Sequence, residues 1–325
     1  MADSAALLSK AYLLQVSNLC QYFSSGRGKK KLVVKAVDDV SFGVRPAETF
    51  GLVGESGCGK TTTGRTIIRL YEPTSGKVHF DGREISGRMN NELRRYLTDH
   101  IAMIFQDPIE SLNPRMTIEE IVGEGLRVRG DRDTHGIREK VVEMLKKVGL
   151  NEEHSTRYPH EFSGGQRQRI GIARAIIVRP RMIIADEPVS ALDVSIQAQV
   201  INLLNDLKEE LGLTILFIAH NLSVVKYFSD RIGVMYYGHL VEIARGDDLY
   251  SKPLHPYTKA LLSAIPEPNP ITERTRKRID YDPERDHDYT KEKPLMVEIE
   301  DEHFIYCSPS ELEKHREFLK EKGHV

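Results

Sequence analysis

The stretch from Thr49 to Thr61 reads TFGLVGESGCGKT. Its first five residues, Thr49–Val53, are apolar or β-branched and predict a strand that is buried on both faces. The next eight, Gly54–Thr61, match the pattern G-x-x-x-x-G-K-[ST], in which a glycine-rich loop connects a strand to a helix. Backbone N–H groups in such a loop can turn inward around an anion, and the helix N-terminus adds partial positive charge. The stretch therefore predicts a phosphate-binding loop.

Three side chains of this loop and helix have expected roles. We expect Lys60 to reach the β- and γ-phosphates of a nucleotide, Thr61 to bind Mg²⁺, and Thr62 to lie within reach of the α-phosphate. The other residues are expected to surround the phosphates: Gly54, Glu55, Ser56, Gly57, Cys58 and Gly59. A redox role for the cysteine is less favoured than that of a small filler. The alternative, a glycine-rich turn without a ligand, is disfavoured because eight residues match in the right context.

A pair of carboxylates could bind Mg²⁺ and activate water beside the predicted phosphate loop. Met182–Ala185 is an apolar run that ends in Asp186 and Glu187. Beside a phosphate loop, Asp186 is expected to hold Mg²⁺, directly or through water, and Glu187 to polarise the attacking water as a general base. Alone, a strand that ends in two acids is weak evidence, because surface turns look similar. Together with Lys60, it predicts a phosphoryl-transfer site.

Two further polar residues follow apolar runs of the same kind. His220 ends the run Thr214–Ala219, and Gln106 follows Ile101–Phe105. Ligands of open α/β sheets bind at the carboxyl ends of the strands. We therefore expect His220 to contact the γ-phosphate and Gln106 to reach Mg²⁺ and the water. The alternatives are a structural histidine at a strand end and a polar strand cap.

The first 245 residues alternate between strands and helices. Strands are predicted at 13–16, 33–42, 49–53, 78–80, 101–105, 182–185, 214–218, 231–236 and 239–244, and helices at 61–70, 137–148, 165–179 and 195–211. Tyr237-Gly238 reads as a tight turn between the last two strands. Residues 107–164 hold mostly helical signals and predict a helical subdomain inserted into an α/β core.

The chain changes character after Gly246. Several prolines follow, with one helix expected at Tyr257–Ala264. Residues 271–325 contain 15 acidic and 11 basic residues, which is typical of either a small appended domain or a partly disordered tail. Strand patterns at 295–299 and 303–306 and a helical pattern at 310–322 favour a small α+β appendage.

Composition limits the function classes. The chain has 325 residues, 40% of them hydrophobic. Its net charge of −2 argues against non-specific electrostatic binding of nucleic acid by the chain as a whole. No apolar run approaches the length of about 20 residues that spans a bilayer. The three cysteines are far apart and form neither a disulfide framework nor a metal knuckle. We therefore expect a cytosolic protein that does not cross a membrane by itself.

Two more motifs carry a family resemblance. Phe162–Gln166 reads FSGGQ and resembles the signature loop of the ATP-binding subunits of ABC transporters, and Ser190, Ala191, Leu192 and Asp193 resemble their D-loop. The order of the motifs also fits. The family usually has Leu where Phe162 stands, and this swap keeps an apolar residue. The resemblance implies an α/β fold of the P-loop NTPase (RecA-like) class, with an inserted helical subdomain, antiparallel β elements and a small C-terminal appendage.

The resemblance also implies a head-to-tail dimer. Each ATP would lie between the phosphate loop of one subunit and the signature loop of the other, here Ser163, Gly164, Gly165 and Gln166. One chain has one copy of each loop, so it cannot enclose its own ATP. The family places an aromatic residue near the N-terminus that stacks on adenine. Phe23 is the first choice and Tyr22 the second, with an ordinary core position as the alternative for either.

A narrower resemblance lies in residues 253–266, PLHPYTKALLSAIP. This stretch is similar to the element after the nucleotide-binding domain of oligopeptide and dipeptide importers and of their nickel and glutathione relatives. Together with FQDP at 105–108, YPHEF at 158–162 and EPVSALDVS at 187–195, it resembles their second ATPase subunit. Many relatives have a cysteine-rich end that can hold an iron–sulfur cluster. Only Cys307 lies there in this chain, and no cluster is expected.

The resulting expectation is a nucleotide-binding domain at 1–245 and a transporter-type extension at 246–325. The chain would hydrolyse ATP to energise oligopeptide import at the cytoplasmic face of the membrane. Its expected partners are a second ABC ATPase in a heterodimer, two membrane-spanning permeases and, indirectly, an extracellular peptide-binding protein, without nucleic acid. A groove in the helical insert would receive the permease, although its apolar residues could equally form the insert's own core.

Three other functions are weighed against this one. The first is the same role in a dipeptide, nickel or glutathione importer, because the ATPase motifs do not touch the cargo. The second is a non-transport ABC ATPase. Those that act on chromosomes place a long coiled coil between the two loops, which the 101 residues between Thr61 and Ser163 cannot hold. Those that act on ribosomes usually have both domains on one chain. The third is an inactive regulatory subunit, which the presence of Glu187 and His220 disfavours.

Overall fold

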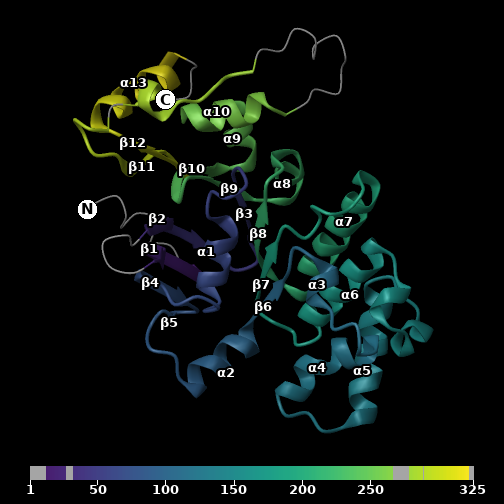
Figure 1. Cartoon of the computed structure of the whole chain (residues 1–325). Helices are drawn as coiled ribbons and strands as arrows, with labels where there is room; N and C mark the ends of the chain where they lie inside the picture. Colours follow the sequence, from purple (N-terminus) through teal and green to yellow (C-terminus); the bar gives the residue numbers. More distant parts are fainter. Residues whose placement is uncertain (1–11, 27–31, 266–277, 288, 322–325) are drawn as a thin grey trace. The chain divides into compact units, whose positions relative to one another are not determined.

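The computed structural model describes residues 12–26, 32–265, 278–287 and 289–321 (Figure 1). The chain divides into two compact units. The first consists of residues 1–45, 49–87 and 219–325, and the second of residues 46–48 and 88–218. Both units combine helices with strands, as expected for an α/β protein.

The first unit contains a four-stranded antiparallel sheet in the order β2-β1-β4-β5. Its strands are β1 (Leu14–Ser25), β2 (Leu32–Val44), β4 (Ser75–Phe80) and β5 (Arg83–Glu84). The register pairs Leu14 with Val44 on one side and with Phe80 on the other. All three side chains are fully buried, so apolar burial fixes this end of the sheet.

The other strands of the first unit follow the order β11-β12-β10-β9-β3. They are β3 (Thr49–Val53), β9 (Arg231–Tyr236), β10 (His239–Arg245), β11 (Leu295–Glu300) and β12 (His303–Cys307). β3 and β9 are parallel, and the remaining pairs are antiparallel. The predicted tight turn at Tyr237-Gly238 is confirmed, because the ladder of β9 and β10 closes with Tyr236 opposite His239.

The helices of the first unit flank these strands (Figure 1). They are α1 (Lys60–Ile67), α8 (Leu222–Phe228), α9 (Gly246–Ser251), α10 (Pro256–Ser263), α12 (Pro283–Asp286) and α13 (Pro309–Glu321). A small core of Leu254, Ile305, Cys307 and Leu319 holds the C-terminal part together. In the described residues, the expected small α+β appendage is therefore present, with two strands and a closing helix.

One buried carboxylate connects the two ends of this C-terminal part. Glu242 of β10 is fully buried. Its Oε1 accepts the backbone N–H of Leu254 at 2.8 Å and lies 2.8 Å from Nε2 of His303, while its Oε2 accepts the N–H of His255 at 3.0 Å. A buried carboxylate is costly unless it is hydrogen-bonded, and these donors satisfy both of its oxygens.

The second unit contains three parallel strands in the order β8-β7-β6. They are β6 (Ile101–Ile104), β7 (Met182–Asp186) and β8 (Thr214–Ala219). Every residue of β7 and β8 is buried, which confirms the prediction of strands covered on both faces. Helix α2 (Asn91–His100) precedes β6 and was not predicted. Asn90 caps it by accepting the N–H of Leu93 at 2.7 Å.

Helices make up the rest of the second unit. They are α3 (Pro108–Ser111), α4 (Ile118–Val128), α5 (Thr134–Lys147), α6 (Gly164–Ile176) and α7 (Val194–Leu211), with 3₁₀ helices η3 (Glu152–Thr156) and η4 (Pro159–Glu161). α4 packs on both α5 and α6 (Figure 1). Within this bundle Leu112, an apolar residue of the insert, is 2% exposed, as expected of a residue in the insert's own core.

Candidate functional site

The predicted phosphate loop connects β3 to α1 within the first unit. Gly59 caps α1 with a φ of 111°, and a Cβ at this position would lie 2.2 Å from the carbonyl oxygen of Ala36. Only glycine fits both this conformation and this close approach. On the other side, the N–H of Gly238 donates to the carbonyl of Cys58 at 2.9 Å. The loop is therefore held between β2 and the turn after β9.

Lys60 lies inside this loop and is 4% exposed. Its Nζ donates to the carbonyl oxygens of Gly54 at 2.7 Å and of Glu55 at 2.8 Å. The loop thus holds an ammonium group beside its own backbone, at the N-terminus of α1, where an anion is favoured. Cys58 is also buried, and burial raises the pKa of its thiol. A neutral thiol favours the interpretation of Cys58 as a filler.

The first turn of α1 contains the other predicted phosphate and metal ligands. Thr61 and Thr62 are half-buried there, and Thr62 accepts the hydroxyl of Thr66 at 2.7 Å through its carbonyl oxygen. The next residue, Thr63, is buried and donates its hydroxyl to the carbonyl of Gly59 at 3.0 Å. The first turn of the helix is therefore fixed by side chains that face inward.

In the second unit, the side chains of two predicted residues, Gln106 and Glu187, are in contact. Asp186 is the buried last residue of β7, and Glu187 follows it. Nε2 of Gln106, which follows β6, donates to Oε2 of Glu187 at 3.1 Å. The backbone of Glu187 has a φ of 45°, its N–H donates to the carbonyl of Ile218 at 2.9 Å, and its carbonyl accepts the N–H of Ser190 at 3.2 Å. These bonds hold a left-handed conformation that few non-glycine residues adopt.

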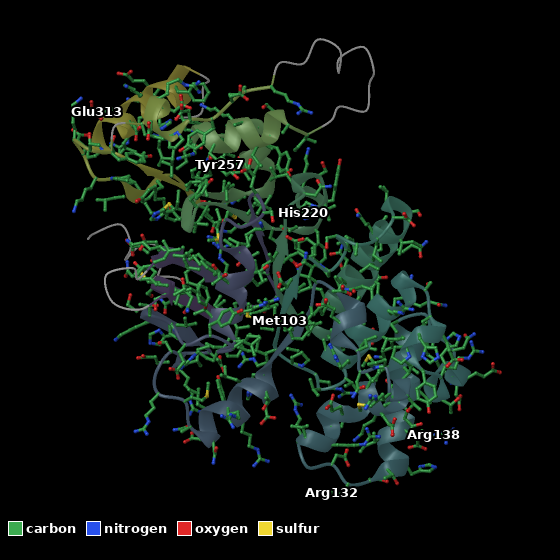
Figure 2. All side chains as sticks on the ribbon, in the orientation of Figure 1. Met103, Arg132, Arg138, His220, Tyr257 and Glu313 are labelled. Carbon is green, nitrogen blue, oxygen red and sulfur yellow. The ribbon has the colours of Figure 1, made fainter. Side chains whose placement is uncertain are left out.

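His220 directly follows β8 and is exposed (Figure 2). The register of β7 and β8 pairs Asp186 with Ile218, two residues before His220. His220 belongs to the first unit and, like Gln106 and Glu187 of the second, follows a parallel strand along the chain.

The predicted signature loop caps helix α6. Ser163 and Gln166 form a capping box, in which Oγ of Ser163 accepts the N–H of Gln166 at 3.4 Å and Oε1 of Gln166 accepts the N–H of Ser163 at 3.0 Å. A Cβ on Gly165 would lie 2.7 Å from Cγ2 of Ile196 on α7, so Ile196 would have to shift to admit a side chain there. A Cβ on Gly164 would lie 3.6 Å from Leu192. The structure therefore places the signature loop against the segment Ser190–Asp193 and the start of α7.

The two candidate aromatic residues on β1 have different surroundings. The hydroxyl of Tyr22 donates to Oδ1 of Asp38, and this hydrogen bond raises the pKa of the hydroxyl. The ring of Phe23 is 39% exposed and meets the ring of Tyr71 edge to face at 5.2 Å. Adjacent residues of a strand point to opposite faces, and only Phe23 presents an exposed ring.

One contact of the phosphate loop was not predicted. The hydroxyl of Tyr257, on α10, accepts the backbone N–H of Glu55 at 3.1 Å. No local sequence pattern predicts a hydrogen bond between residues so far apart in the chain. The available signal was the position of Tyr257 in the stretch 253–266, which resembles a transporter-specific element.

Three features together define the ABC class of P-loop ATP-binding proteins. They are a phosphate loop between a strand and a helix, the carboxylates Asp186 and Glu187 at the end of a buried strand, and a helix capped by a signature loop. Residues 37–190 match the family model "ABC transporter", and residues 241–291 match "Oligopeptide/dipeptide transporter, C-terminal region". The chain belongs to the family of oligopeptide and dipeptide transport ATP-binding proteins.

The oligopeptide transport ATP-binding protein OppF of Bacillus subtilis is 57% identical over 92% of this chain and 97% of its own length. The dipeptide transport ATP-binding protein DppF of Lactococcus lactis is 50% identical over 94% and 96%. The ATP-binding cassette MJ0796, solved as a dimer in a post-hydrolysis state with ADP and Pi, is 30% identical with a TM-score of 0.65. That match covers 71% of this chain and 98% of the other. The chain is accordingly an ABC ATPase that binds ATP.

Among the described residues, no helix combines the length and the apolar character that crossing a bilayer requires.

Proposed function

We propose that this chain is the ATP-hydrolysing subunit of an importer of oligopeptides. The observation that carries the proposal is the joint match of both parts of the chain, the cassette at 37–190 and the transporter C-terminal region at 241–291. The similarity to OppF extends over 92% of the chain, so it includes the extension as well as the cassette. In domain terms, residues 1–245 form the nucleotide-binding domain and residues 246–325 the extension.

Within the site, the roles follow from the chemistry of each group. Lys60 binds the β- and γ-phosphates, and the N–H groups of the loop surround them. Thr61, Asp186 and Gln106 offer hydroxyl, carboxylate and carboxamide oxygens, the donors that Mg²⁺ prefers. When bound, Mg²⁺ neutralises charge on the phosphates. Glu187 accepts a proton from the attacking water as general base, and His220 contacts the γ-phosphate.

The contact between Gln106 and Glu187 supports this assignment. The Gln106 amide donates to Oε2 of Glu187 at 3.1 Å, which orients the carboxylate. The hydrogen bonds of the backbone on both sides of Glu187 hold it in place. A fixed carboxylate that follows a buried strand is suited to proton transfer, because catalysis depends on the position of the base.

The signature loop supplies the other wall of the ATP site from a partner subunit. In the capping box the N–H of Ser163 is used by Gln166, and its Oγ accepts one bond. The Ser163 hydroxyl can still donate its proton, and the N–H groups of Gly164 and Gly165 lie in the first turn of α6, where they have no partner within the helix. These donors form a second anion site, so two chains together enclose each ATP. The partner is a second ABC ATPase, in a heterodimer.

Phe23 stacks on the adenine ring in this proposal. Replacing Phe23 with alanine should weaken ATP binding by roughly 5- to 150-fold, since base stacking on an aromatic ring contributes about 1–3 kcal/mol. Titration calorimetry on the purified complex measures the change. Tyr22→Phe is the matched control, because it removes a hydroxyl that bonds Asp38 and should leave ATP affinity within twofold. The reverse ranking of the two variants would assign the stacking to Tyr22.

The assembly acts at the cytoplasmic face of the membrane, where the chain is peripheral and binds two membrane-spanning permease subunits. An extracellular peptide-binding protein delivers the cargo to the permeases. The experiment is to purify the chain with its complex from native membranes, identify the subunits by mass spectrometry and measure ATPase activity with the binding protein and candidate cargoes.

The expected result of this purification is two polytopic proteins, a second ABC ATPase, and ATPase activity stimulated by oligopeptides. Stimulation by dipeptides, nickel or glutathione alone would replace the cargo in the proposal. Co-sedimentation with ribosomes, without any polytopic partner, would overturn it in favour of a non-transport ATPase.

A further inference from the structure

A side chain of the C-terminal extension, that of Tyr257, contacts the phosphate loop. Tyr257 lies in the first turn of α10 and is 3% exposed (Figure 2). Its hydroxyl oxygen accepts the backbone N–H of Glu55 at 3.1 Å. Glu55 is the second residue of the loop, and its carbonyl oxygen accepts Nζ of Lys60 at 2.8 Å. The same peptide segment is therefore bonded on one side to the extension and on the other to the phosphate-binding ammonium.

The ring of Tyr257 is firmly placed. It packs against the rings of Tyr236 and Tyr281, with centroids 4.4 Å and 5.5 Å away. Its backbone N–H donates to Nδ1 of His255, which caps α10, at 3.1 Å. The N–H of His255 in turn donates to the buried carboxylate of Glu242. A side chain held by two rings and a capped helix loses little additional freedom when it forms a hydrogen bond.

The state of the hydroxyl suits an acceptor role. Burial raises the pKa of Tyr257, so the group remains a neutral phenol across the physiological range. A phenol oxygen can accept the N–H of Glu55 and still donate its own proton. The bond fixes the orientation of one peptide group in a loop whose function is to direct peptide N–H groups at an anion.

We propose that Tyr257 is a positioning residue that holds the phosphate loop in its nucleotide-binding conformation, so that the C-terminal extension sets the affinity for ATP. The inference rests on the proposed ATPase function of the same loop. Preorganised donors bind a ligand more tightly than donors that must first be ordered, so loss of the bond weakens binding rather than chemistry. Tyr257 touches neither phosphate nor water in this proposal.

The test is Tyr257→Phe in the assembled complex. This change removes the oxygen and keeps the ring between Tyr236 and Tyr281. ATP binding, measured by calorimetry, should weaken by about 3- to 10-fold, the usual range for a lost neutral hydrogen bond. The KM for ATP should rise by a similar factor, while kcat at saturating ATP changes by less than twofold. Hydrogen exchange of the loop peptide that contains Glu55 should become faster, a readout that packing alone would not change.

Tyr281→Phe is the matched control. Its ring lies in the same cluster, but its hydroxyl is not the acceptor of the Glu55 N–H, so ATP affinity and exchange of the loop should match the wild type. Tyr257→Phe with wild-type affinity and wild-type exchange would overturn the inference. A failure of the proposed function looks different, because the wild-type complex itself would then not bind or hydrolyse ATP. Thermal unfolding of each variant confirms that the comparison is between folded proteins.

Discussion

A Glu187→Gln variant should bind ATP with wild-type affinity and lose turnover by about 10²–10⁴-fold, the range that a general base contributes. The amide has the shape of the carboxylate and keeps an oxygen for the 3.1 Å bond from Gln106. It cannot accept a proton from water, however. In the proposed arrangement the two subunits enclose each ATP, and hydrolysis removes the γ-phosphate that lies between them. The variant should therefore accumulate as a closed, ATP-bound pair of ATPase subunits.

Phosphate release by the assembled complex measures the loss, and gel filtration with and without ATP measures the closed pair. Glu210→Gln is a matched control in the same unit, since Glu210 pairs with Lys147 at the surface and should tolerate the change. Unchanged phosphate release in Glu187→Gln would refute the base assignment. Loss of ATP binding would contradict it as well, because the carboxylate would then serve binding rather than proton transfer.

Replacing Lys60 with alanine is the second change with a large expected effect. The variant should bind ATP about 30- to 1,000-fold more weakly, because removal of a buried charge that pairs with phosphate is worth about 2–4 kcal/mol. Two carbonyl oxygens, on Gly54 and Glu55, also lose their donor, so the loop itself becomes less ordered. Both effects act on binding, and turnover should fall with it.

Calorimetry with ATP and Mg²⁺ provides the measurement. Lys77→Ala is the control. Lys77 is an exposed residue of β4 in the same unit, and its replacement removes the same positive charge. A general effect of net charge would lower affinity in both variants, and a site effect only in the first. Lys60→Arg should not restore affinity, since the planar guanidinium does not fit a position that is 4% exposed. Wild-type affinity in Lys60→Ala would count against the phosphate-loop assignment.

Several elements follow directly from local sequence. The strand Thr49–Val53 and the strand Arg231–Tyr236 have the predicted bounds, because continuous apolar runs flanked by a glycine loop or a tight turn leave few alternatives. The pairing of Gln106 with Glu187 was also accessible, since both follow parallel strands whose carboxyl ends meet at one edge of a sheet.

Other features depend on interactions that local patterns do not reveal. The first strand was expected to end at Val16 and continues to Ser25, because bulges around Asn18, with a φ of 48°, break the alternation of apolar residues without ending the ladder. Helix α2 was missed because only Leu93 and Leu97 of its side chains are buried, too few for a helical pattern.

The fully buried carboxylate of Glu242 has a consequence for folding and for shortened chains. It joins the segment before α10 to β12, which lies about fifty residues further along. A chain cut before β11 would leave β10 paired with β9 alone, with its other edge open, and would deprive the Glu242 carboxylate of His303. The extension is therefore not a removable tail. Its two ends should unfold together as one cooperative unit, because Glu242 bonds both the segment before α10 and His303 of β12. We therefore expect the position of Tyr257 against the phosphate loop to depend on β12.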